Sequence, residues 1–206
     1  MRFWFAVGFL ALTVFAYPAN AGFKEGLSAF KKKDYATAMA EWSSLAEEGH
    51  ALAKYNLAIM YRKGLGVKKD QLLSLKWYQD AADSGLAKAQ YSLALFYEKG
   101  RGGLPKNATA AVNLYMQAAE SGHSYAQYSL ASHLEDGRGT ERDLVEAMTW
   151  YIVTAKTSKG KLRRKSAEAR DKLKESLSDD EISMAEDFAR EWSRDYLLLR
   201  QKRKKE

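Results

Sequence analysis

The sequence has 206 residues, no cysteine and only two prolines, Pro18 and Pro105. Without cysteine the chain cannot be a disulfide-rich scaffold, a zinc ribbon, an iron–sulfur protein, a cysteine protease or a bacterial lipoprotein. So few prolines argue against a β-sandwich or barrel with many turns. The content of 46% hydrophobic and 29% charged residues excludes a collagen-like or wholly disordered chain. We therefore expect one domain of ordinary size or a short repeat array.

The first twenty-one residues have the pattern of a secretory signal peptide. Arg2 gives a positive start, residues 3–17 carry no charge, and Ala19-Asn20-Ala21 places small side chains where a signal peptidase reads them. We expect cleavage after Ala21 and export to the periplasm or the cell exterior. The apolar run is shorter than the roughly 20 residues of a spanning helix. An uncleaved membrane anchor is the alternative.

Internal repetition is the strongest signal in the sequence. Three segments align at intervals of 36 and 37 residues, at 49–58, 85–94 and 122–131. Each has apolar residues at helical spacing, then a Gly-x-Gly pair, then Asp or Asn, and then an aromatic pair or its equivalent. This order predicts two helices per unit, with the glycines ending the first helix. Asp70, Asn107 and Asp143 stand where the N-cap of the second helix belongs.

Stacking such units predicts an all-α fold, an α-solenoid, because one unit cannot bury its apolar face alone. The pattern resembles the Sel1-like repeat family, which is related to tetratricopeptide repeats, through the series Ala51-x-Ala53-x-x-x-Leu57-Ala58, Gly64-x-Gly66 and Trp77-Tyr78-x-x-Ala81-Ala82. The resemblance covers about residues 34–158, with departures at Ser124 and Leu134. It implies helix-turn-helix repeats and a non-enzymatic adaptor that binds another envelope protein or peptide segment.

The sequence divides into seven expected segments. They are a signal peptide (1–21), an N-terminal half-repeat or cap (22–48), three repeats (49–84, 85–121 and 122–158), C-terminal capping helices (159–199) and a basic tail (200–206). Ser178-Asp-Asp-Glu181 has the form of a capping box and predicts the start of the last helix.

The positive charge is concentrated at the C-terminal end. Residues 22–155 carry 16 basic and 15 acidic side chains, whereas residues 156–206 carry 16 basic and 11 acidic ones. The basic tail contains Arg200, Lys202, Arg203, Lys204 and Lys205. It predicts binding to an anionic surface such as lipid headgroups or an acidic polymer. A solvated, frayed terminus is the alternative, and nucleic acid is not expected as a partner of an exported protein.

Catalytic and metal-binding patterns are sparse. Ser-x-x-Lys occurs at Ser28/Lys31 and Ser158/Lys161, which is about the number that chance placement gives, and its Ser-Asp-Asn and Lys-Thr-Gly companions are absent. We expect no catalytic residue, although some family members are assigned β-lactamase activity, so a hydrolase of β-lactam or cell-wall type is the alternative. His50 and His123 hold the same repeat position, which indicates a turn preference. We expect no metal site, His133 included, and no cofactor.

The expected functional site is a groove along the first helices, which tend to line the concave side of such solenoids. Positions that vary between repeats, spaced i, i+4 and i+7, are the predicted partner contacts. They are Asn56, Met60, Lys63, Ser92, Phe96, Lys99, Ser129, His133 and Asp136. Met60 and Phe96 are expected to be exposed and to anchor a peptide or helix. The alternative is that they pack against a neighbouring helix.

Overall fold

The computed structural model describes residues 19–202, and within that range it contains ten helices and no strand. Most of the predicted signal peptide lies outside the described residues, as does the end of the basic tail, residues 203–206. The helices are α1 (Ala19–Lys31), α2 (Tyr35–Glu47), α3 (Ala51–Lys63), α4 (Gln71–Asp83), α5 (Ala87–Lys99), α6 (Ala108–Glu120), α7 (Ser124–Asp136), α8 (Leu144–Thr157), α9 (Gly160–Lys174) and α10 (Asp179–Lys202).

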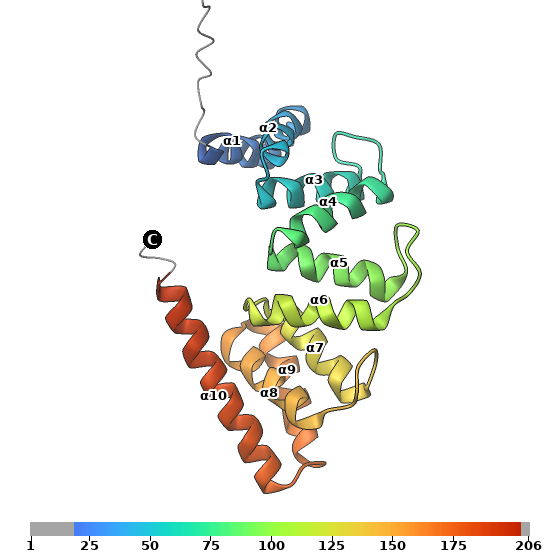
Figure 1. The fold of residues 1–206 in the computed structure, drawn as a ribbon. Coiled ribbons are helices and arrows are strands. Elements are labelled where there is room, and N and C mark those ends of the chain that lie inside the picture. The colour runs from blue at the N-terminus through green and yellow to red at the C-terminus, as the bar shows by residue number, and fades with distance from the viewer. Residues whose placement is uncertain (1–18, 203–206) are drawn as a thin grey trace, which may run out of the picture.

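Consecutive helices pack in pairs, and the pairs stack in chain order. The first pair is α1 with α2, and α3 with α4, α5 with α6 and α7 with α8 form the three predicted repeats. Figure 1 shows the pairs following one another from α1 to α8. The predicted α-solenoid is confirmed. The segment predicted as a half-repeat holds both α1 and α2, so it is a helix pair that precedes the first repeat.

Polar caps and glycines determine where the repeat helices begin and end. Asp70, Asn107 and Asp143 are the N-caps of α4, α6 and α8, and each side chain accepts a hydrogen bond from the backbone N–H three residues later, at 2.8–2.9 Å. Each such cap contributes about 1 kcal/mol to helix stability. The first helices end at glycines with φ near +65°, such as Gly64 and Gly100, a left-handed conformation that suits glycine. The caps predicted from the sequence are therefore confirmed.

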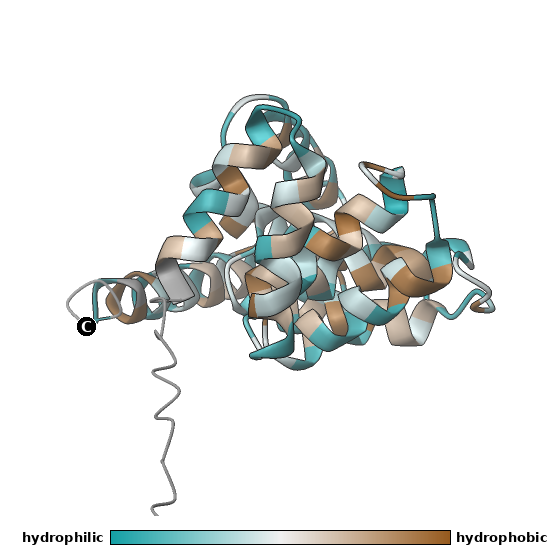
Figure 2. Ribbon diagram, turned by 90° about the horizontal axis from the view of Figure 1, so that it is seen from above, coloured by the Kyte–Doolittle hydropathy of each residue, from teal (hydrophilic) through white to brown (hydrophobic). Residues whose placement is uncertain are grey.

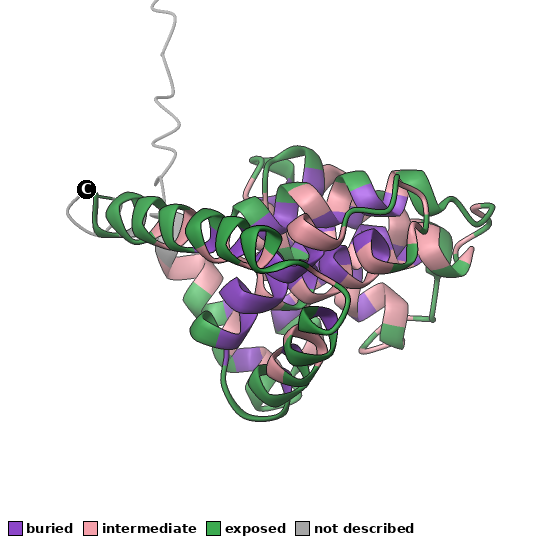
Figure 3. Ribbon diagram, turned by 90° about the horizontal axis from the view of Figure 1, so that it is seen from below, coloured by how far each residue is buried: buried purple, intermediate pink, exposed green. Residues whose placement is uncertain are grey.

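Small and aromatic side chains share the core. Ala53, Ala89 and Ala126 on the first helices are fully buried, and this allows the helix axes to approach closely. Tyr78 and Tyr115 on the second helices are also buried and fill the space between units. Apolar and polar residues alternate around each helix in Figure 2, while the buried residues in Figure 3 gather inside the stack. Each repeat thus completes its core with residues of the next.

The last two helices pack against α8, as predicted for capping helices. On α10, Ala185 and Ala189 are buried, and the Trp192 ring meets Trp150 of α8 edge-on with centroids 5.5 Å apart. The predicted capping box forms as well, because the Glu181 carboxylate accepts a hydrogen bond from the Ser178 N–H at 2.8 Å. The outer face of α10 is exposed (Figure 3). Between residues 19 and 202, no helix has the length and apolarity to cross a bilayer.

Candidate partner-binding groove

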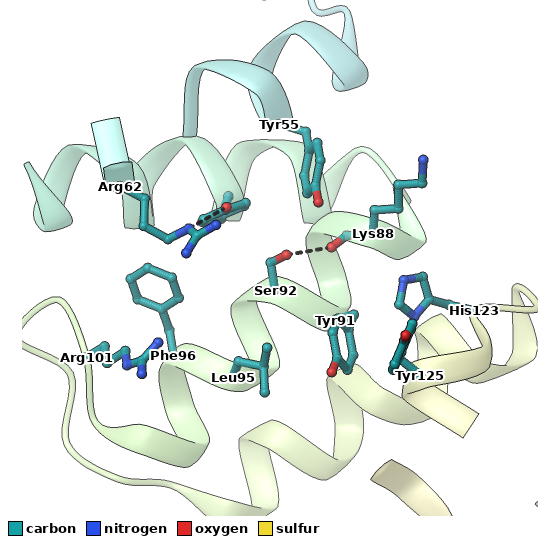
Figure 4. A pocket seen from close by; sticks show the side chains of 11 residues that line it. Tyr55, Arg62, Lys88, Tyr91, Ser92, Leu95, Phe96, Arg101, His123 and Tyr125 are labelled. Atoms are coloured by element: carbon teal, nitrogen blue, oxygen red, sulfur yellow. Dashed lines mark hydrogen bonds between the residues drawn. The ribbon is translucent and has the colours of Figure 1, made fainter. Parts of the chain in front are cut away.

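An open pocket of about 420 Å³ lies across the first helices of the three repeats. Its lining comes from α3, α5 and the start of α7, with contributions from Tyr78 of α4 and from Arg101 in the loop after α5. We call this pocket the first-helix groove. Figure 4 shows two ends to it: Arg62 and Arg101 lie around Phe96 at one end, and tyrosines, His123 and Lys88 lie at the other.

The aromatic end consists of rings that contact one another. The His123 ring stacks on Tyr91 with centroids 4.7 Å apart, and Tyr91 also lies 6.2 Å from Tyr125. Tyr55 packs edge-on against the buried Tyr78 at 5.6 Å. Tyr125 is 58% exposed, so a broad aromatic face is open to solvent. Such a face binds apolar side chains or the flat surface of a peptide bond with little loss of side-chain entropy.

His123 has a structural role that fixes its protonation state. It is the N-cap of α7, and its Nδ1 accepts a hydrogen bond from the Ala126 N–H at 3.2 Å. Burial lowers the pKa of the His123 imidazole, and the nearby Lys88 ammonium lowers it further. The imidazole is therefore neutral at pH 7. His50 makes the same bond to the Ala53 N–H at the start of α3, so the predicted turn preference of these two histidines is confirmed.

The basic end is formed by arginines from neighbouring units. The Arg62 Nε donates a hydrogen bond to the Tyr78 hydroxyl at 3.2 Å, which fixes the guanidinium against the wall of the groove. Arg62 and Arg101 lie on either side of Phe96 in Figure 4. The same two arginines and Phe96 also line an adjoining pocket of about 280 Å³ together with Lys69 and Gln71. The groove thus joins a fixed positive charge to an aromatic surface.

The hydrogen bond to the second-helix tyrosine recurs in every repeat, but the charge of its partner changes. Arg62, Glu98 and Glu135 occupy the same repeat position. The Tyr115 hydroxyl donates to the Glu98 carboxylate at 2.7 Å, and the Tyr151 hydroxyl donates to Glu135 at 2.8 Å. Burial raises the pKa of both phenols, and the adjacent carboxylates raise it further.

The tyrosine of repeat 1 is affected differently. Burial also raises the pKa of the Tyr78 phenol, but here the Arg62 guanidinium opposes the shift. The row of tyrosine partners is therefore positive at repeat 1 and negative at repeats 2 and 3.

Three predicted contact residues are buried, so the expectation that Met60 and Phe96 are exposed anchors is wrong. Met60 is fully buried, and Phe96 and His133 are each 3% exposed. Phe96 packs against Tyr78 with ring centroids 5.6 Å apart and forms part of the groove floor. His133 is bonded through Nδ1 to the Arg138 carbonyl at 2.7 Å. These positions face the neighbouring helix, which is the alternative that the sequence also allowed.

Of the other predicted contacts, Ser92 is in the groove and the rest lie outside its lining. Ser92 lines it, while its hydroxyl donates to the Lys88 carbonyl at 2.9 Å. Asn56 and Ser129 are half-buried, and Lys63 and Lys99 are exposed at helix ends, outside the lining. Asp136 is exposed and pairs with Arg138 at 3.0 Å.

The basic tail is described only in part. Arg200 and Lys202 belong to the last turn of α10, and Lys202 is exposed. Arg203, Lys204 and Lys205 lie outside the described residues. Binding of an anionic surface by this tail stays a prediction.

The residues that dominate the groove are not among the predicted contacts. They are Tyr55, Arg62, Tyr91, Arg101 and Tyr125. When the three repeats are aligned with one another, a tyrosine recurs at one position of each first helix, as Tyr55, Tyr91 and Tyr128. This recurrence could have indicated two of the groove tyrosines. Each of these tyrosines directly precedes a predicted contact, as Tyr55 precedes Asn56, so the tyrosines face a direction rotated by about 100° around the helix.

The described residues contain a larger pocket outside the groove. A pocket of about 700 Å³ lies between α8 and α10, against Trp150, Phe188 and Trp192. The described residues contain no group of three or more His, Asp or Glu side chains that could hold a metal. One of the two Ser-x-x-Lys pairs is Ser158/Lys161. The Ser158 hydroxyl is buried and has no hydrogen-bond partner among the described residues, whereas the Lys161 side chain is exposed.

Comparison with known proteins agrees with the geometry. The Sel1 repeat family model matches residues 51–86, 87–123 and 124–156, which are the three helix pairs α3 to α8. Sel1 repeat proteins generally mediate protein–protein interactions, and most are non-enzymatic. No curated protein matches the sequence significantly.

Two solved structures are similar. A Sel1 repeat protein from Oxalobacter formigenes is 35% identical, with a TM-score of 0.63, over 66% of this chain and 56% of that one. A protective antigen of uropathogenic Escherichia coli with a Sel1-like repeat fold is 23% identical, with a TM-score of 0.59, over 86% of this chain and 46% of that one. The chain spans about half the length of each. Because the family model covers half of the sequence with three repeats, the chain belongs to the Sel1 repeat family.

Proposed function

We propose that the protein is a non-enzymatic adaptor of the bacterial cell envelope that binds a segment of a partner protein along the first-helix groove. The observation that carries the proposal is the groove itself, where an exposed aromatic surface adjoins fixed arginines. Tyrosine and arginine are the residue types that dominate binding energy at protein interfaces. Their rings and guanidinium groups are held by neighbouring contacts, so little conformational entropy is lost when a partner binds.

The envelope location is supported by the sequence of the first twenty-one residues, and the bacterial origin by the sources of the similar structures. A chain without cysteine also suits an oxidising compartment, because it cannot form incorrect disulfides. On this proposal the mature protein begins at Gly22, and α1 then starts three residues later than in the full chain.

Site-specific photo-cross-linking tests the proposal. A benzophenone amino acid replaces Tyr125 in the full chain produced in bacteria, and a second strain carries it at Lys76, an exposed residue of α4 that is outside the groove. We expect one partner protein to be cross-linked from position 125 and not from position 76. The purified partner should then bind the wild-type protein at least tenfold more tightly than a Tyr55→Ala/Tyr91→Ala variant. The intact mass of the recovered protein reports whether the chain begins at Gly22.

The same experiment separates the groove from the C-terminal end. Leu197, Leu198 and Leu199 are each more than half exposed on α10, directly before the basic tail, so this end is the second candidate interaction surface. Partner binding that survives the tyrosine changes but is lost on deletion of residues 200–206 would transfer the function to the tail. Equal cross-linking from positions 125 and 76 would contradict the groove assignment.

A further inference from the structure

The chemistry of the partner segment can be specified further, on the basis of the proposed groove function. We infer that the first-helix groove takes an acidic peptide segment whose carboxylate lies between Arg62 and Arg101. A neighbouring aromatic or apolar side chain of the segment packs on Tyr91 and Tyr125. The inference depends on three observations: the composition of the groove, the uncommitted charge of its cations, and the change of charge from repeat 1 to repeat 2.

The lining of the groove is one-sided in charge. It includes Arg62, Lys88 and Arg101 and contains no aspartate or glutamate. Lys69 adds a fourth cation in the adjoining pocket, which also lacks an acidic residue. With His123 neutral, these side chains give the groove a net positive charge at pH 7. A segment that carries carboxylates is therefore attracted, and a basic segment is repelled.

The cations of the groove form no ion pair with any described residue. Between residues 19 and 202, neither arginine of the groove forms an ion pair, although five arginines elsewhere in this range do. Arg62 uses its Nε for the Tyr78 hydroxyl, so its terminal N–H groups are available to a ligand. A guanidinium presents two parallel N–H groups that match the two oxygens of a carboxylate. The fixed Arg62 is thus prepared for such a contact.

The position of the acidic group along the stack follows from the next repeats. At the position of Arg62, repeats 2 and 3 carry Glu98 and Glu135, and both carboxylates are held in place by buried tyrosine hydroxyls. A segment that continued along repeats 2 and 3 with acidic residues would meet repulsion from these two glutamates. Within the groove, both guanidinium groups, Arg62 and Arg101, lie around Phe96, so the carboxylates of the partner belong at that end. Its aromatic or apolar side chain belongs at the other end, on Tyr91 and Tyr125, where Lys88 is a further cation. The same repulsion disfavours a uniform polyanion such as a nucleic acid.

Defined peptide probes test the inference. Three fluorescein-labelled 12-residue peptides share one sequence with a central Phe, and differ in having four Asp/Glu, four Gln or four Lys residues on one side of it. We expect the acidic peptide to bind the full chain at least tenfold more tightly than the Gln peptide in fluorescence anisotropy at low salt, and the Lys peptide not to bind. An Arg62→Gln/Arg101→Gln variant should lose at least tenfold in affinity for the acidic peptide. An Arg164→Gln/Arg194→Gln variant loses the same charge at exposed positions outside the groove and should bind like wild type.

The outcomes separate this inference from the proposed function. Equal binding of the acidic and Gln peptides, or equal loss in both arginine variants, would overturn the acidic-segment inference. If the partner cross-linked from position 125 still depends on Tyr55 and Tyr91 in that case, the adaptor groove stands with a different specificity. A concentration-dependent dimer in light scattering that the Arg62→Gln/Arg101→Gln change dissociates would identify a second copy of the chain as the occupant, and would also overturn the inference.

Discussion

Repeat 1 and repeats 2 and 3 share one architecture but differ in the charge that they place beside the buried tyrosine of the second helix. In all three repeats, the twelfth residue of the first helix is hydrogen-bonded to a buried tyrosine of the second helix. It is Arg62 in repeat 1 and a glutamate in the other two. The bond survives the change because a tyrosine hydroxyl both donates and accepts.

The difference shows how a repeat can change its specificity without changing its fold. The tyrosine ring is buried in each repeat, and its hydroxyl bonds a partner of either charge. A second variable position, occupied by Met60, Phe96 and His133, behaves in the opposite way. It is buried in every repeat, so its variation concerns packing between helices.

The largest predicted effect tests this contrast between a packing position and a groove position. Phe96→Ala should lower the free energy of unfolding by about 3–5 kcal/mol, because the ring is buried against Tyr78 and its removal leaves a cavity. Leu72→Ala is the control, since Leu72 is 67% exposed and should cost less than about 0.5 kcal/mol. Urea unfolding followed by circular dichroism measures both. A small effect of Phe96→Ala, with loss of partner binding alone, would return Phe96 to the role of an exposed anchor.

A smaller effect is expected from the tyrosine hydroxyls. Tyr115→Phe should cost about 1 kcal/mol, because it removes a short hydrogen bond to a carboxylate that is only partly exposed. Tyr78→Phe should cost about half as much, since the Arg62 side chain then regains water as its partner. The two variants are compared by urea unfolding at pH 7. A larger cost for Tyr78→Phe would mean that the Arg62 contact is the stronger of the two.

Most of the fold could be predicted because it depends on local chemistry. The second helices are capped by Asp70, Asn107 and Asp143, whose side chains bond the backbone N–H three residues later. Helix α3 ends at Gly64 because glycine can adopt a positive φ. Stacking of the repeats follows from their matching apolar faces. None of these inferences requires knowledge of distant contacts.

The groove face could not be predicted in the same way. A first helix in a solenoid is covered on two sides, by its own second helix and by the next repeat, so two adjacent stripes have similar composition. The stripe of Met60, Phe96 and His133 varies in chemistry and therefore suggests a binding face, whereas Tyr55 and Tyr91 are the same residue type in successive repeats and give no such signal. Only the packing of neighbouring helices decides which stripe is open. Arg101 also comes from a loop whose course the repeat pattern does not define.

The smallest effect on neutral-pH stability is expected from Arg62→Glu, which gives repeat 1 the charge of repeats 2 and 3. At pH 7 the free energy of unfolding should change by less than about 0.5 kcal/mol, because the Tyr78 hydroxyl can donate to the new carboxylate as Tyr115 does to Glu98. The pKa of the Tyr78 phenol, already raised by burial, should rise further when the opposing guanidinium is replaced by a negative charge. Tyrosines labelled with carbon-13 and titrated by NMR report this directly.

The sign of the effect on alkaline stability follows from this shift. Above pH 10 an unfolded tyrosine loses its proton, while native Tyr78 in the Arg62→Glu protein keeps it, so the unfolded state gains stability as the pH rises. The added loss is at most about 1.4 kcal/mol for each pH unit above 10. Urea unfolding at pH 7, 10 and 11 should therefore show a steeper decline for Arg62→Glu than for wild type, whereas Arg164→Glu, which makes the same charge change at an exposed position on α9, should decline like wild type. Equal slopes with an unchanged Tyr78 titration would mean that the contrast between the repeats is one of geometry alone. A steeper slope would show that one side chain sets the electrostatic character of a repeat while the stack stays the same.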